Sequence, residues 1–135
     1  MSGYGKVIRE SEERDGKSSS LSNNDYGSLH SEAKLKLIET QRGGAQFGKG
    51  IDVEVEQKGN KIPVEVTVLP SWKGNAFPFE ELTVRQDRIK RPNQHFAYFN
   101  FDLDVMTIVR PSMLKVRDQN GNFRIQKEAL KFQSI

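Results

Sequence analysis

The stretch "GIDVEVEQKGNKIPVEVTV", residues 50–68, alternates apolar and polar side chains twice, on either side of a short polar turn. Alternation with a period of two places every second side chain on the same face of a β-strand. The apolar side chains are Ile51, Val53, Val55, Ile62, Val64, Val66 and Val68. The stretch therefore predicts a β-hairpin with one apolar face, and a sheet that buries this face.

The polar face of this hairpin depends on its register. A two-residue turn at Gly59 and Asn60 would place Glu54 opposite Glu65, and Asp52 opposite Thr67. Like charges opposed across a ladder repel by about 0.2–1 kcal/mol unless a cation lies between them. The polar face is then either a divalent-cation site or a solvated surface on which the glutamates splay apart.

A short amphipathic helix is predicted before the hairpin, because Leu29, Ala33 and Leu37 recur at helical spacing. Its expected N-cap is the hydroxyl of Ser28 or Ser31. Serine favours this position because its oxygen accepts a hydrogen bond from a free N–H group of the first turn.

The chain after the hairpin predicts further strands at residues 95–101 and 105–110, and a second hairpin around residues 120–121. Residues 81–85 fit either a short strand or the start of a helix, and residues 126–132 fit a short final helix. This order of elements predicts an α/β domain built on a single mixed β-sheet with flanking helices.

Two segments lack periodic apolar residues. Residues 1–28 are rich in serine, glycine, asparagine and charge, which predicts a flexible polar N-terminal arm before a single domain at residues 29–135. Residues 42–50 contain four glycines and predict a flexible connection from the helix to the hairpin. We expect the arm to be the part that binds a protein partner.

The composition, with 35% hydrophobic and 29% charged residues, is that of a globular domain. No run approaches the roughly 18 apolar residues of a membrane span, and the N-terminus lacks the apolar core of a signal peptide. We therefore expect no membrane partner and a cytoplasmic location, in the host cell if the protein is viral. The chain has no cysteine, which excludes disulfides and thiol nucleophiles.

The net charge of +3 is concentrated in the stretch "RQDRIKR", residues 85–91. Such a cluster attracts phosphate, although a solvated charged face has the same composition. The candidate nucleic-acid contacts are Arg85, Arg88, Lys90 and Arg91, together with Lys73.

The helix with Glu32, the glycine-rich connection, "GIDVEVE", the tight turn and "IPVEVTV" together resemble the core of the PD-(D/E)xK, or restriction-endonuclease-like, superfamily. The resemblance spans residues 30 to about 110 and implies a restriction-endonuclease-like core that acts on DNA. It implies that Asp52 and Glu65 hold Mg²⁺ or Mn²⁺ and that Glu32 is the glutamate of the helix. Glu54, opposite Glu65 in the expected register, is a further candidate metal ligand.

The chain departs from the family pattern at Thr67, where the pattern has a lysine. That lysine helps to deprotonate the attacking water and offsets charge in the transition state, whereas a threonine hydroxyl can at most orient the water. Candidates for a relocated basic group are Lys73, Lys49 and Arg85.

Two functions therefore stay open. One is a metal-dependent endonuclease whose catalytic set is Asp52, Glu65 and Glu32, with Thr67 in the lysine position. The other is a non-catalytic module on the same fold that binds nucleic acid or a protein partner, as in a viral or mobile-element accessory or assembly protein. A homo-oligomer fits either function.

Two further features are interpreted without a catalytic role. His30 and His95 have no neighbouring serine or aspartate pattern of a triad, and are interpreted as cap or surface residues. The aromatic stretch "HFAYFNF", residues 95–101, could stack on bases, but strand alternation sends at least one set of its rings into the core.

Overall fold

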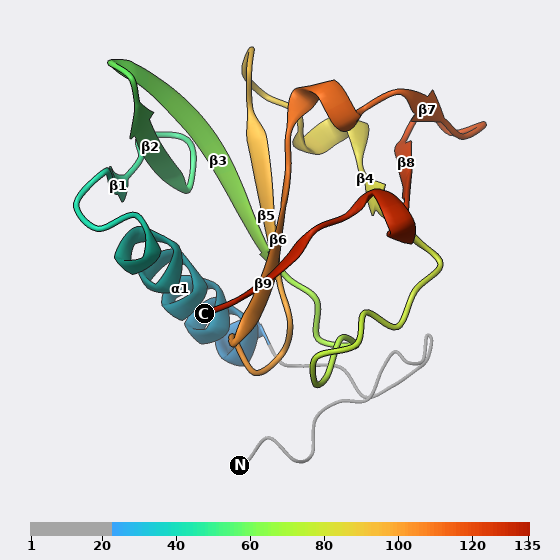
Figure 1. The fold of residues 1–135 in the computed structure, drawn as a ribbon, viewed down its shortest axis with the longest axis horizontal. Helices are drawn as coiled ribbons and strands as arrows, with labels where there is room; N and C mark the ends of the chain where they lie inside the picture. Colours follow the sequence, from blue (N-terminus) through green and yellow to red (C-terminus); the bar gives the residue numbers. More distant parts are fainter. Residues whose placement is uncertain (1–22) are drawn as a thin grey trace.

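The structure, a computed structural model, describes residues 23–135, so most of the predicted arm lies outside the described residues. One α-helix, α1 (Asn23–Thr40), precedes a six-stranded mixed sheet and a three-stranded sheet (Figure 1). The six strands lie in the order β1 (Ala45–Phe47), β2 (Val53–Gln57), β3 (Asn60–Val68), β5 (His95–Phe99), β6 (Val105–Val109) and β9 (Phe132–Ser134). The smaller sheet is β4 (Glu81–Val84), β8 (Phe123–Gln126) and β7 (Val116–Arg117).

The central strands of the large sheet, β3, β5 and β6, are buried on both faces. Helix α1 packs on one face, where Ala33 and Leu37 meet the valines of β3. The small sheet covers the other face, where Leu82 and Ile125 pack against Phe96 of β5. The α/β class with a mixed sheet is confirmed, but a second sheet stands where we expected a flanking helix. Within residues 23–135 no helix is long and apolar enough to cross a membrane.

Helix α1 begins earlier than predicted. Residues 23–28, assigned to the arm from the sequence, are helical, so the expected N-cap at Ser28 or Ser31 is wrong. Tyr26 explains the difference, because it lies one turn before Leu29 and His30 and packs against the same core. The helix ends at Thr40, followed by Arg42 and Gly43 with φ of 50° and 91°.

The hairpin forms, but its predicted register is wrong by two residues. The turn is Lys58 and Gly59, with φ of 51° and 80°, as in a type I′ turn. Glu54 consequently faces Pro63 rather than Glu65. A shift of two keeps every side chain on its predicted face, because the strand period is also two. Glycine decides the turn, since the second central position of a type I′ turn favours it.

The glycine-rich connection contains a strand that the sequence did not suggest. Ala45 and Phe47 of β1 pair with Val55 and Val53 of β2. The strands at β5 and β6 and the hairpin β7–β8 are confirmed, and residues 81–84 form a strand. The expected final helix is wrong: a 3₁₀ turn, Lys127–Ala129, is followed by β9.

Strand β5 runs parallel to β3, joined by a crossover over residues 69–94 that carries β4 and the 3₁₀ turn Gln86–Arg88. The aromatic rings of β5 lie in the core on both faces of the sheet. Phe96 and Tyr98 point towards the small sheet, and Phe99 points towards α1. These rings therefore offer no exposed surface to a nucleic-acid base.

Candidate functional site

The pairing between β2 and β3 ends before β3 does. Val53 and Val64 form the last pair of the ladder, whereas β3 continues to Val68. On its other side β3 stays paired with β5 through Val68. Residues 65–68 therefore have an outer edge whose N–H and C=O groups need partners from elsewhere in the chain. We call these four residues the open edge of β3.

Side chains supply these partners. The N–H of Val66 donates to Asp52 Oδ2 at 2.8 Å, and the carbonyl oxygen of Val66 accepts from His30 Nε2 at 3.0 Å. The N–H of Val68 donates to the Tyr26 hydroxyl at 3.3 Å. Tyr26 and His30 also stack, with ring centroids 6.0 Å apart. Helix α1 and Asp52 together take the place of a neighbouring strand.

Asp52 is an ion-pair centre on the α1 side of this edge. Its Oδ2 lies 3.1 Å from His30 Nε2 and its Oδ1 lies 4.0 Å from Lys34 Nζ, and the side chain is only 16% exposed. Burial by itself raises the pKa of Asp52, but the hydrogen bonds from His30 and Val66 and the nearby positive charges outweigh it and lower the pKa. The hydrogen bond to Asp52 raises the pKa of His30, against burial. Both shifts favour the charged pair.

Glu65 lies on the other face of β3. It is buried, and its Oε2 is 3.4 Å from Nη1 of Arg88, which comes from the crossover. Tyr98 faces the same interior, and burial raises the pKa of its hydroxyl. Burial also raises the pKa of Tyr26, whose hydroxyl lies within the electrostatic reach of Arg88 and of both carboxylates, Asp52 and Glu65. The open edge of β3 therefore brings the two acidic groups into one electrostatic environment.

The basic crossover is held against this site by a buried amide. Gln94 Oε1 accepts from the N–H groups of Lys90 and Arg91, at 2.8 and 3.1 Å, and its Nε2 donates to the Arg88 carbonyl at 2.7 Å. The guanidinium of Arg91 in turn donates to the carbonyl of Lys49, three residues before Asp52. Arg88 thus lies beside Glu65, and Arg91 beside the loop that precedes Asp52, in an ordered turn.

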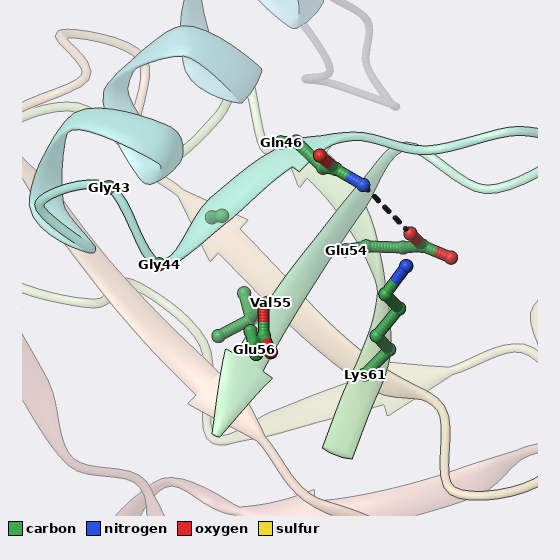
Figure 2. A pocket seen from close by; sticks show the side chains of 8 residues that line it. Gly43, Gly44, Gln46, Glu54, Val55, Glu56 and Lys61 are labelled. Carbon is green, nitrogen blue, oxygen red and sulfur yellow. Dashed lines mark hydrogen bonds between the residues drawn. The ribbon is translucent and has the colours of Figure 1, made fainter. Parts of the chain in front are cut away.

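The remaining predicted acidic residues lie elsewhere. Glu54 projects from β2, where it accepts from the Gln46 amide at 3.4 Å and lies near Lys61 (Figure 2). Glu32 is exposed, because it is two residues from both His30 and Lys34 and so points away from their side of α1. Thr67 is partly buried on the same face of β3 as Glu65.

Some of the basic residues predicted for the site have their contacts elsewhere in the structure. Arg85 is exposed and pairs with Asp87 at 2.7 Å, and Lys73 Nζ lies 5.4 Å from the centroid of the Phe101 ring. Lys34 is the lysine that approaches Asp52, although the sequence suggested Lys73, Lys49 or Arg85. The available signal was the spacing of four between Tyr26, His30 and Lys34, which puts three polar tips on one helix stripe.

The donor atoms at the open edge of β3 suit a hard divalent cation. The Asp52 carboxylate and the Val66 carbonyl oxygen lie within 3.1 Å of the same atom, His30 Nε2, and the carboxylate of Glu65 comes from the neighbouring residue on the other face of β3. Oxygen atoms of these kinds are the ligands that Mg²⁺ and Mn²⁺ prefer. Among residues 23–135, no three histidine or acidic side chains are grouped to hold a metal by themselves. The remaining ligands of a bound ion would thus come from water and substrate, as is usual for Mg²⁺.

No model of a known protein family and no curated protein sequence matches this chain. The site is therefore defined by its geometry. It consists of two partly buried carboxylates at the point where two strands separate, each paired with its own basic side chain, Lys34 or Arg88. Partly buried titratable groups with specific charge partners are typical of functional sites.

Proposed function

We propose that this chain is a nuclease-like domain that hydrolyses DNA phosphodiester bonds with Mg²⁺ or Mn²⁺. One observation carries the proposal: the pairing of β2 with β3 ends at Val53, so that Asp52, the residue before it, bonds the main chain of β3 next to Glu65. We further propose that α1, the β2–β3 hairpin and β5 form a restriction-endonuclease-like core. Asp52, Glu65 and the Val66 carbonyl would hold the metal ion, which when bound offsets phosphate charge and activates water.

Lys34 takes the role of the lysine that Thr67 replaces. Its side chain is 24% exposed and its Nζ lies 4.0 Å from Asp52 Oδ1, so the ammonium can reach a phosphate oxygen beside the carboxylate. A half-buried positive charge at that point stabilises the negative charge that develops in the transition state. Arg88 and Arg91 bind the flanking phosphates and position the strand.

His30 controls access to the same oxygens. Its Nε2 lies between Asp52 Oδ2 and the Val66 carbonyl, at 3.1 and 3.0 Å. A protonated imidazole competes there with a divalent cation for both oxygens. Cleavage should therefore increase as the pH rises through the raised pKa of His30.

An assay in Mg²⁺ or Mn²⁺ that follows cleavage of supercoiled plasmid and of single-stranded DNA tests the proposal. We expect Asp52→Asn and Glu65→Gln to lose on the order of 100-fold in rate, and Lys34→Met a similar factor. Glu54→Gln is the matched control, because it removes a carboxylate from β2 outside the site. The proposal fails if the wild-type protein cleaves no DNA, or if Asp52→Asn cleaves as fast as Glu54→Gln.

A second candidate is the non-catalytic module that binds nucleic acid or a protein partner. It is favoured by the ion pairs themselves, since Asp52 and Glu65 already have protein partners without a metal ion. In this case DNA binding measured by fluorescence anisotropy is unaffected by EDTA and by Glu65→Gln. Binding would instead decline in Arg91→Ala, with no cleavage in any metal ion.

A further inference from the structure

An aromatic ring stands exposed beside the candidate site. Phe47, the last residue of β1, is 54% exposed, although its cross-strand partner Val53 is fully buried. Lys34 Nζ lies 5.8 Å from the centroid of the Phe47 ring and 4.0 Å from Asp52 Oδ1. The ammonium therefore bridges an exposed ring and the carboxylate of the site. This arrangement fits one nucleotide: the base would stack on the ring, and its phosphate would contact the ammonium beside the carboxylate.

The ring is mounted on an ordered support. The N–H of Gly48 donates to the Asp52 carbonyl at 3.2 Å, and a side chain at Gly48 would collide with Ile51, whose Cγ2 lies 2.5 Å from the site of a Cβ. Arg91 holds the Lys49 carbonyl from the crossover side. The turn from Phe47 to Asp52 is thus closed by one hydrogen bond and held at Lys49 by another. The distance from the ring to the carboxylate is therefore set before any ligand binds.

We infer that Phe47 stacks on an unpaired base of single-stranded DNA, and that the site acts on single strands or unpaired ends. The inference rests on the proposed function, which it extends by naming the substrate class. Every base has a face that can stack on an aromatic ring, but in a duplex both faces are covered by neighbouring base pairs. A ring next to a phosphate-binding lysine can therefore engage a base only where the strand is unpaired.

Binding in EDTA, where no cleavage takes place, tests this inference. A fluorescein-labelled single-stranded oligonucleotide and its duplex are titrated with the full-length protein, and affinity is read by anisotropy. We expect Phe47→Ala to weaken single-strand binding by at least about tenfold and to leave duplex binding unchanged. Phe47→Tyr should retain the wild-type affinity. Val116→Ala, which removes an exposed apolar side chain from β7, is the control.

An oligonucleotide of abasic residues completes the test. Wild-type protein should bind it as weakly as Phe47→Ala binds the normal strand, and Phe47→Ala should bind both strands equally. The inference is overturned if the wild-type protein binds no single strand. It is also overturned if Phe47→Ala weakens the binding of single strand and duplex equally, or weakens the binding of neither. If Phe47→Ala loses single-strand binding but the wild-type protein cleaves no DNA in Mg²⁺, only the proposed function is overturned. If the wild-type protein cleaves DNA but Phe47→Ala binds single strands with the wild-type affinity, only this inference is overturned.

Discussion

The two halves of β3 obtain their outer hydrogen bonds in different ways. From Asn60 to Val64 the strand pairs with the main chain of β2, so no particular side chain is required. Along the open edge of β3 the partners are the side chains of Tyr26, His30 and Asp52. The second arrangement gathers titratable groups at one place. In this half, the groups that complete the sheet are therefore the same groups that could do chemistry.

The largest expected loss of stability comes from truncating the buried valines of β3, and it should be the same in the two halves of the strand. Val64 and Val68 are both buried, at 4% and 1% exposure. Val64→Ala and Val68→Ala should each lower the free energy of unfolding by about 2–3 kcal/mol, through lost burial and a cavity. Urea denaturation measures both values. A difference above about 1 kcal/mol between them would show that the halves differ in packing as well as in hydrogen bonding.

The next effect separates the halves. Asp52→Ala leaves the Val66 N–H without its acceptor, and should cost about 1–2 kcal/mol in urea denaturation. Glu56→Ala is the control, because the Glu56 side chain is exposed and only the main chain of Glu56 pairs with Lys61 across the ladder. Equal stability of the two variants would mean that water replaces Asp52 at the edge without loss.

A smaller effect is expected from the hydroxyl of Tyr26. Tyr26→Phe keeps the ring but removes the acceptor for the Val68 N–H, so it should cost about 0.5–1.5 kcal/mol. Amide hydrogen exchange locates the change: Val68 should exchange faster, and Val64 should keep its wild-type rate. Unchanged exchange at Val68 would contradict the assignment of this hydrogen bond.

The pH dependence of stability tests the pair of His30 and Asp52. The raised pKa of His30 gives a contribution that is complete below its ordinary value of 6.5 and is lost as the pH rises through the folded pKa. The lowered pKa of Asp52 gives a contribution that is present above 3.8 and is lost as the pH falls through the folded pKa. Both contributions coexist between about pH 4 and pH 6.5.

His30→Gln should therefore abolish the loss of stability that the wild-type protein shows between about pH 6 and pH 8. Urea midpoints at the two pH values measure the difference. His95→Gln should retain the loss, because His30 is intact and because burial lowers, rather than raises, the pKa of His95. Identical pH dependence of the wild-type protein and His30→Gln would exclude the charged pair.

The smallest effect belongs to the turn of the main-chain-paired half. Lys58 has a φ of 51°, a left-handed conformation that asparagine adopts more readily than lysine. Lys58→Asn should therefore stabilise the protein by about 0.5 kcal/mol, as a small upward shift of the urea midpoint. Destabilisation would mean that the Lys58 side chain makes a contact that the main-chain geometry does not reveal.

Much of this architecture was predictable from local patterns. The alternation in residues 50–68 predicted the hairpin and its buried face, and the aromatic and β-branched runs predicted β5 and β6. The register was not predictable with the same accuracy, because either pair around Gly59 can form a two-residue turn. The turn with Gly59 in its second position was the one that formed.

The candidate site was predictable only in part. Asp52 and Glu65 were assigned from the resemblance of the hairpin to a nuclease-family motif, whereas Glu54 and Glu32 lie away from them. His30 and Lys34 could not be assigned to Asp52, because about twenty positions of sequence separate them and no periodicity links a helix face to a strand end.

The sequence by itself determined which faces are apolar and where acidic and basic groups concentrate. These properties follow from repeats of two residues in strands and of about four in helices, which can be recognised in a short stretch of sequence. Only the tertiary structure decided that the pairing of β2 with β3 ends at Val53 and that α1 supplies Tyr26 and His30 to the open edge of β3. The physical reason is that buried N–H and C=O groups must find partners, but hydrogen bonding does not specify which distant residues provide them.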